Sequence, residues 1–308
     1  MDISIVSLDD SPEDFIDNLA PDFFFSSANF ARLWRTLGGN PICLLLRVEG
    51  QTVGCMTAVE FGVGPLKTFQ AMPNGCYSRL LVADNCELDM TAASKKIGEA
   101  IILKGYRRSI ITDFYGRYSG LNGFDSAEQE TLLVDISAKD WQPPDSKLRQ
   151  QIKKAASEGI ELADFEADKH LVGFMQLVKL HEKRRGVKSK YNQKFFTALA
   201  EIAKNDKRVI WKYCERDGAP VASSIFFREG DSLIHWQMYY DKQFSNLQAT
   251  KYIPYAVARN SAGSGVRYLN LGATPAGAEG AVFYKAKWGG KSMCYKCYTH
   301  NNVLGKIW

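Results

Sequence analysis

Two kinds of hydrophobic pattern alternate along the chain. Runs rich in apolar and β-branched residues predict strands, at residues 42–48, 52–61, 67–71, 77–82, 109–114 and 131–136, and later at 208–216, 219–229, 231–240, 266–271 and 292–299. Apolar residues with helical spacing predict helices, which open at Ser11, Ser27 and Asp84 in the first half and cover about 146–158, 168–184, 192–205, 248–262 and 278–287 in the second. Because strands alternate with helices and also follow one another directly, this order predicts an α+β fold with a mixed sheet in each half.

The second half of the chain repeats the order of the first. Residues 46–56 describe a strand, a tight turn at Glu49-Gly50 and a second strand, and residues 214–224 repeat this around Asp217-Gly218. Acidic-Gly hairpin turns are common, so coincidence is the alternative. A repeat of this length suits two copies of a whole domain rather than a solenoid. Two such domains predict a ligand site between them.

We predict that residues 141–145 form the linker between the two domains, since the two prolines of this segment disfavour both a helix and a central strand. We therefore expect an N-terminal domain over 1–144 and a C-terminal domain over 145–308. In an alternative arrangement, the last strand, at 292–299, packs back on the first domain.

The composition and charge of the chain indicate which ligands and which cellular compartment to expect. The chain has 308 residues and a net charge of +5, which allows an anionic substrate, a phosphate-bearing cofactor or acidic lipid without requiring any of them. No apolar run is long enough for a transmembrane segment, and the N-terminus lacks the apolar core of a signal peptide. The seven scattered cysteines suit reduced thiols. These features predict a cytoplasmic protein.

The most specific stretch, residues 280–290, sets Lys285 among aromatic residues. A lysine that large apolar groups strip of hydration can stabilise an oxyanion or bind a phosphate strongly. The alternative is an amphipathic helix that packs Phe283 and Trp288 inward while Lys285 and Lys287 face water.

This stretch also carries a family resemblance. Tyr284-Lys285-x-x-Trp288-Gly289 resembles the aromatic-Lys-x-x-aromatic-Gly signature near the end of Fem-type transferases, which have two GNAT-like domains and include enzymes that add amino acids to peptidoglycan precursors. An ordered set of further segments is similar to the same family, at residues 148–160, 181–186 with 195–196, 218–222 and 265–272. The resemblance implies two tandem GNAT-like domains, each with a mixed, mostly antiparallel sheet flanked by helices. It places Lys285 at the acyl-transfer site and makes Trp288 a candidate substrate-binding residue.

The donor follows less directly from the resemblance. GNAT enzymes that use acetyl-CoA usually carry glycines where their central helix begins, so that backbone N–H groups grip the pyrophosphate. The stretch 244–251 has no glycine, although Gln248 and Thr250 keep a polar helix start and are candidate donor-binding residues. We therefore expect no tightly bound cofactor, and a donor that is either acyl-CoA or aminoacyl-tRNA.

Other candidates come from charge and strand alternation. Strict alternation would place His235, Gln237 and Tyr239 on one face of a strand, where His235 and Tyr239 could handle protons. A hydrogen-bonded core histidine is the alternative. Asp113 and Tyr115 end the strand of the first repeat and are candidate substrate-binding residues.

Basic residues between 183 and 190, among them Arg184 and Arg185, could bind phosphates or a tRNA, as could Lys153. A solvated helix end is the alternative. Cys294-x-x-Cys297-x-x-His300 is a poor zinc pattern, because a strand sends the two cysteines to opposite faces. We expect no metal.

Together these observations predict an N-acyltransferase or aminoacyltransferase that moves its group from an activated donor to an amine or hydroxyl. In this hypothesis Lys285, His235 and Tyr239 are catalytic. The partners it allows are tRNA and a lipid-linked or polysaccharide precursor of the cell envelope at the inner membrane surface. An acetyl-CoA- or acyl-CoA-dependent N-acetyltransferase of small molecules remains an alternative, as does a non-catalytic binding protein that kept the fold.

Overall fold

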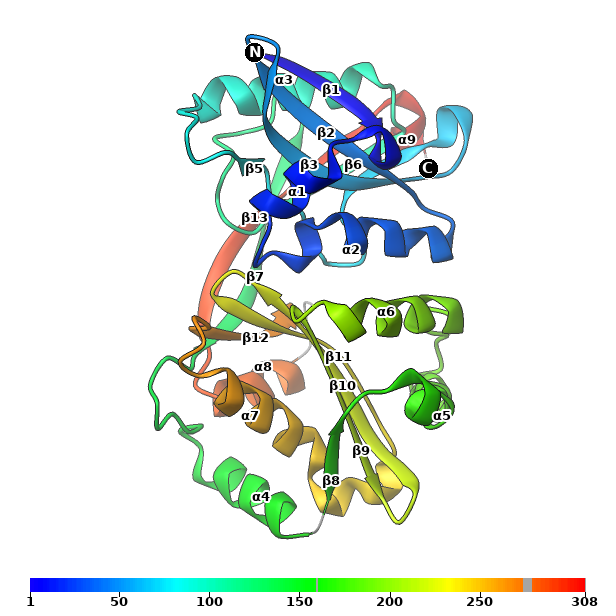
Figure 1. Ribbon diagram of the computed structural model, residues 1–308, viewed down its shortest axis with the longest axis vertical. Helices are drawn as coiled ribbons and strands as arrows, with labels where there is room; N and C mark the ends of the chain where they lie inside the picture. The colour runs from blue at the N-terminus through cyan, green and yellow to red at the C-terminus, as the bar shows by residue number, and fades with distance from the viewer. Residues whose placement is uncertain (159, 274–278, 308) are drawn as a thin grey trace. The chain divides into compact units, whose positions relative to one another are not determined.

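The computed structural model describes residues 1–158, 160–273 and 279–307, and its contacts divide the chain into two compact units. Unit 1 comprises Met1–Gln129 and Cys294–Trp308, and unit 2 comprises Glu130–Met293 (Figure 1). Residues 130–144 thus group with unit 2, whereas the sequence analysis put the boundary after residue 144. β7 (Asp125–Asp135) and β13 (Lys291–Asn301) are the strands in which the chain passes from one unit to the other.

The sheet of unit 1 is mostly antiparallel. Its strands are ordered β1 (Asp2–Ser7), β2 (Asn40–Val48), β3 (Gln51–Phe61), β4 (Thr68–Ala71), β6 (Arg108–Asp113) and β13, with β5 (Leu81–Val82) paired to β3. Only the β4–β6 pair among these is parallel. The helices of the unit are α1 (Glu13–Leu19), α2 (Ala28–Leu33), α3 (Met90–Leu103) and α9 (Val303–Ile307).

Unit 2 has the same construction. Its strands are ordered β8 (Glu161–Asp164), β9 (Val209–Arg216), β10 (Ala219–Glu229), β11 (Ser232–Tyr240), β12 (Tyr268–Ala273) and β7. The β11–β12 pair is parallel and the others are antiparallel. Helices α5 (Ala167–Arg185) and α6 (Gln193–Asn205) cover one face, and α4 (Ser146–Ser157), α7 (Ala249–Ser261) and α8 (Glu279–Lys287) lie on the other (Figure 1).

This correspondence confirms the duplication. In both units an edge strand is followed by two helices, three consecutive antiparallel strands, one helix and a strand that pairs in parallel with the third of these strands, and unit 1 has the short strand β5 in addition. The two hairpin turns also match, because Glu49 and Gly50 have φ values of 51° and 80°, and Asp217 and Gly218 have values of 52° and 73°. Positive φ at both central residues is the type I′ turn, whose twist suits a two-residue hairpin. The predicted α+β fold of two similar units, each with a mixed and mostly antiparallel sheet flanked by helices, is therefore confirmed.

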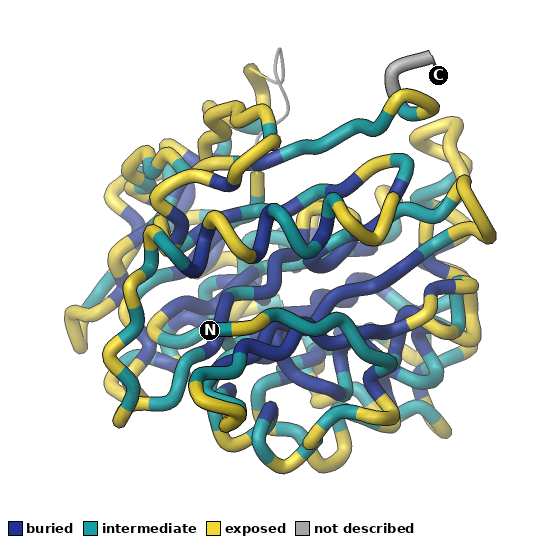
Figure 2. The backbone as a smooth tube through the Cα atoms, turned by 90° about the horizontal axis from the view of Figure 1, so that it is seen from above, coloured by how far each residue is buried: buried dark blue, intermediate teal, exposed yellow. Residues whose placement is uncertain are grey.

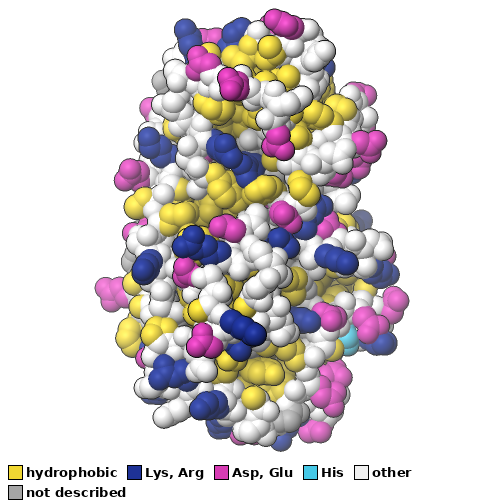
Figure 3. Space-filling model, turned by 60° about the vertical axis from the view of Figure 1, so that its left-hand side comes forward, with side chains coloured by type: hydrophobic (Ala, Val, Ile, Leu, Met, Phe, Trp, Pro, Cys, Tyr) yellow, Lys and Arg dark blue, Asp and Glu magenta, His cyan; other side chains and the backbone are white. Residues whose placement is uncertain are grey.

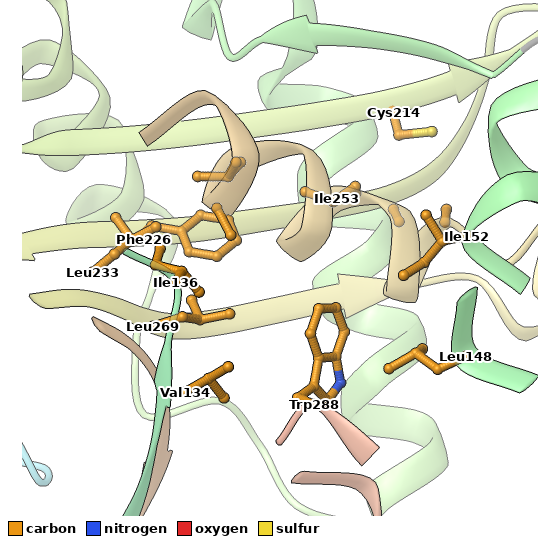
Figure 4. Close-up of a cluster of buried hydrophobic side chains, with 14 of the residues drawn as sticks. Val134, Ile136, Leu148, Ile152, Cys214, Phe226, Leu233, Ile253, Leu269 and Trp288 are labelled. Carbon is orange, nitrogen blue, oxygen red and sulfur yellow. The ribbon is translucent and has the colours of Figure 1, made fainter. Parts of the chain in front are cut away.

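The core of unit 2 lies between its sheet and α4, α7 and α8. Buried residues follow the strands, whereas the outer helices alternate buried and exposed positions (Figure 2). Figure 4 shows Trp288 beside α7, with Leu148 on one side and Val134 and Leu269 on the other. Trp288 is fully buried, so this aromatic residue of the motif belongs to the core.

The segment 141–145 is tied to unit 2. The Arg149 guanidinium donates to the carbonyls of Pro143 at 2.8 Å and Pro144 at 2.6 Å. The Arg259 guanidinium donates to the carbonyl of Trp141 at 3.3 Å. A segment read as an open linker from its prolines is therefore held by two arginines.

Several elements depart from the sequence analysis. Helix α3 begins at Met90 rather than near Asp84, because Asp89 accepts hydrogen bonds from the backbone of Thr91 and Ala92 at 2.9 and 3.1 Å. Strands β1 and β8 and helix α9 were not predicted. The first could have been found, since Ile3 and Ile5 alternate with polar residues and pack on the core of unit 1.

Candidate functional site

A cavity of about 330 Å³ opens in unit 2 where β11, β12, α7 and α8 meet. It is lined by His235, Trp236, Gln237, Met238, Tyr240, Thr250, Lys251, Leu271 and Tyr284. Three predicted features therefore come together here, namely His235, the start of α7 and the aromatic-lysine motif of α8. Cavities of this size can hold part of a small molecule.

Lys285 follows Tyr284 on α8 and is only 4% exposed. Its ammonium donates a hydrogen bond to the carbonyl of Gly272 in β12. That strand end is braced, since the Gly272 carbonyl also accepts from Thr131 Oγ1 at 2.9 Å, and the Gly272 amide donates to Asn270 Oδ1 at 2.8 Å. Loss of hydration lowers the pKa of Lys285 to about 8. Burial of the Lys285 ammonium therefore costs stability, and the hydrogen bond to the Gly272 carbonyl fixes its position.

Helix α8 presents its residues differently from either sequence interpretation. Tyr284, Lys285 and Trp288 lie one, three and four positions apart, so they share the inner face of the helix. Phe283 is 66% exposed, with Lys287 Nζ 4.4 Å from the centre of its ring. The idea that Phe283 packs inward is therefore wrong. Tyr284 and Trp288, whose rings are 6.0 Å apart, lie on the same face as Lys285.

His235 stacks on Phe226, with ring centres 4.5 Å apart and planes at 16°. Its Nε2 atom is buried and has no hydrogen-bond partner among the described residues. Burial, and then the charge of Lys285, lowers the pKa of His235 to about 4. At neutral pH the imidazole is neutral, and Nε2 is left to interact with a ligand.

Tyr239 does not share this face, contrary to the alternation expected. Phe226 pairs with His235 whereas Ile225 pairs with Gln237, so the strand carries a bulge at Trp236. The extra residue reverses the alternation beyond it. Tyr239 consequently packs against Phe174 of α5 and Phe196 of α6, with ring centres 5.4 and 6.0 Å away. Its burial raises its pKa to about 12.

The start of α7 supplies the cavity with positive potential. Gln248 adopts φ 57° before the helix, and its Nε2 donates to the Ser245 carbonyl at 2.8 Å. Thr250 lines the cavity, as does Lys251, whose pKa is lowered by burial and then by the charge of Lys287. Among the residues that the structure describes, no carboxylate lines the cavity. Lys251 was missed in the sequence, although its place in the first turn of a predicted helix was the available signal.

Arg184 and Arg185, near the end of α5, differ in their contacts. The Arg184 guanidinium lies 4.1 Å from the centre of the Tyr240 ring and donates to the Tyr240 carbonyl at 3.2 Å, so it contacts a residue that lines the cavity. Arg185 is exposed, as is Lys153 on α4. Figure 3 shows basic and acidic side chains interspersed over the face it draws.

Asp113 and Tyr115 lie in unit 1. The carboxylate of Asp113 accepts from the backbone of Arg117 at 2.8 Å and of Tyr118 at 3.0 Å, which closes the turn after β6. Tyr115 packs its ring edge-on against Phe23, with centres 5.9 Å apart. Both side chains therefore have local structural contacts.

Neither a metal centre nor a membrane span is found in the part of the chain that the structure describes. No three His, Cys, Asp or Glu side chains there are grouped as metal ligands. Each helix in these residues is too short or too polar to cross a bilayer.

Comparison with known proteins bears on this site. Residues 145–286, which include the cavity, match the family model described as an acetyltransferase (GNAT) domain. No curated protein sequence matches the chain.

Solved structures share the fold across both units. A crystal structure of FemX is similar with a TM-score of 0.72 and 11% identity over 98% of both chains. L-PGS from Bacillus licheniformis has a TM-score of 0.59 and 13% identity over 95% of this chain and 92% of the other. A tandem GNAT protein from the clavulanic acid biosynthesis pathway has a TM-score of 0.54 and 11% identity over 97% and 98%. These similarities confirm the predicted fold of two tandem GNAT-like units.

Proposed function

Since residues 145–286 match a GNAT acetyltransferase domain and the whole chain has the fold of FemX, we propose that the protein is an acyltransferase whose reaction site is the unit 2 cavity. It moves an acyl or aminoacyl group from an activated donor to an amine or hydroxyl. The observation that carries this proposal is Lys285, a buried cation that the fold holds beside the cavity although its burial costs stability. Such costs are typical of functional groups.

Acyl transfer requires a positioned nucleophile and a group that stabilises the oxyanion. When a nucleophile attacks the donor carbonyl, a bond to carbon forms and the carbonyl oxygen becomes an oxyanion. In this proposal Lys285 stabilises that charge in a site with little water, where a fixed cation is most effective. Collapse of the intermediate breaks the bond to the leaving sulfur or oxygen atom, which takes up a proton.

His235 is the proposed proton carrier. Its pKa of about 4 keeps the ring neutral at pH 7. In this proposal the ring takes the proton of the attacking group only transiently and passes it to the leaving group. Its buried Nε2 faces no described hydrogen-bond partner. Tyr239 is less suited to this role, because the bulge at Trp236 directs it to the other face of the sheet.

The donor is proposed to be anionic. Lys251 and the positive end of the α7 dipole favour phosphate-bearing ligands in a cavity whose described lining contains no carboxylate. Without glycines at this helix start, we favour an aminoacyl donor over acyl-CoA. The fold similarity to FemX and L-PGS supports an acceptor of the cell envelope. The GNAT family match supports the second candidate, acyl-CoA-dependent transfer to a small molecule.

A panel of donors tests this proposal. A donor present at 100 times its dissociation constant should stabilise the protein by about 2.7 kcal/mol. We expect a thermal shift with bulk aminoacyl-tRNA or, for the second candidate, with acyl-CoA, and a smaller shift in Lys251→Met. Uncharged tRNA and free CoA are the matched controls for binding without the acyl group. No shift with any donor at high concentration would contradict the proposal.

A further inference from the structure

A second and larger cavity lies elsewhere in unit 2, and acyl transfer makes no use of it. Its volume is about 560 Å³, within the range of small-molecule sites. Its walls come from β7, the segment before α4, the start of β12, the turn after α8 and the start of β13. None of the residues lining the first cavity lines this one.

The floor of this cavity is aromatic and apolar. The half-buried ring of Trp141 stacks near Trp288, with centres 6.4 Å apart and planes at 15°. Pro144 closes one side, where Gly289 approaches so closely that an added Cβ would lie 3.1 Å from the proline ring. Gly289 also has φ 81°, so two separate constraints keep this wall in place. A rigid aromatic surface of this kind favours a flat ligand.

The rim of the cavity has an excess of positive charge. Asp135 and Arg267 form an ion pair at 3.4 Å, and Asp135 also accepts a hydrogen bond from the Ser137 hydroxyl at 2.6 Å. Arg267 lies 4.9 Å from the centre of the Tyr268 ring as well, so its charge is already engaged. Lys291 is exposed and has no hydrogen-bond or ion-pair partner among the described residues. The unneutralised charge of the cavity is therefore that of Lys291.

From this combination we propose that the cavity binds a flat, largely apolar molecule with one anionic group, its ring against Trp141 and its anion at Lys291. The inference rests on residues that the acyl-transfer proposal does not use, so either can fail alone. Trp288 borders this cavity and contacts Tyr284, which lines the first, one helical turn away. A bound ligand would thus contact the turn that directly follows the helix of Lys285.

Two fluorescent probes of similar shape separate the apolar from the ionic part of this site. The aromatic sulfonate 8-anilinonaphthalene-1-sulfonate carries the anion, and neutral N-phenyl-1-naphthylamine lacks it. We expect the sulfonate to bind at one saturable site and Lys291→Met to raise its Kd about tenfold, the size of one charge-assisted hydrogen bond. The neutral probe should bind wild type and Lys291→Met equally. Lys296→Met, an exposed lysine of the same strand, is the matched control and should change neither Kd.

Two further variants locate the probes. Trp141→Ala should weaken both probes, with thermal unfolding measured in parallel to show that the variant is folded. Lys251→Met should leave both unchanged, because Lys251 lines the other cavity. The proposal is overturned if the sulfonate does not bind, if Lys291→Met leaves its Kd unchanged, or if Lys251→Met weakens it instead.

Discussion

Replacing Lys285 by methionine should make the protein more stable at neutral pH while removing its activity. Methionine has a similar length and no charge, so it keeps the apolar contacts of the side chain. The wild-type ammonium is 4% exposed and donates a hydrogen bond to the Gly272 carbonyl. Loss of hydration on burial of the charge is a cost that the folded state bears.

The pKa sets the size and the pH range of this effect. A pKa of about 8 in the folded state against 10.5 in the unfolded state corresponds to on the order of 3 kcal/mol against the charged form. Between these two values the unfolded state binds more protons, so wild-type stability should rise as pH rises from about 8 to about 10.5. Below pH 8 the full cost is present in the wild type and absent in Lys285→Met.

Urea unfolding at pH 7 and at pH 10 measures the effect. At pH 7 we expect Lys285→Met to gain 1 to 3 kcal/mol in the free energy of unfolding, roughly the upper limit given by the pKa, and at pH 10 most of this gain should vanish. Lys287→Met is the control, since that lysine packs on the exposed Phe283 ring. Equal stabilities of wild type and Lys285→Met at pH 7 would refute the buried charge.

Three other results are expected. The segment 141–145 should resist limited proteolysis in the wild type and become cleavable in Arg149→Met, because this variant loses the two hydrogen bonds from Arg149 to the carbonyls of the segment. Early cleavage in the wild type would contradict this. Gly218→Val should lower the free energy of unfolding in urea by about 1 to 2 kcal/mol, because the turn needs φ 73°; an unchanged midpoint would show that the turn relaxes. If tRNA is the donor, reversing Lys183 and Arg185 to glutamate should weaken binding and flatten its salt dependence, and an unchanged salt slope would return these residues to a solvated helix end.

The repeated fold could be predicted because its signals are local. The turns at Glu49-Gly50 and Asp217-Gly218 fix two-residue hairpins, and the apolar runs beside them fix the strands. The repeat then predicted the same order of elements along both halves of the chain. Helix α3 was placed too early because its N-cap depends on which of several aspartates reaches the backbone amides, and Asp89 does so rather than Asp84.

The site was harder to predict because it depends on irregular backbone. A single bulge at Trp236 separates His235 from Tyr239, and period-two alternation carries no sign of such an insertion. The burial of Lys285 and the exposure of Phe283 reverse ordinary hydrophobicity. The aromatic residues beside Lys285 and the family resemblance were the signals that pointed to that lysine. Deviation from the local rules is typical of functional positions, where position and charge matter more than stability.

The most direct test of the central claim is the rate of group transfer by Lys285→Met with the donor that the thermal-shift panel identifies. Removal of one fixed oxyanion stabiliser typically lowers turnover about 100- to 1000-fold. We expect a loss of that size in Lys285→Met, with donor affinity nearly unchanged, and little loss in Lys287→Met on the same helix. Equal and small losses in the two variants would show that Lys285 does not act on the reacting carbonyl, and would contradict the proposed function at its central residue.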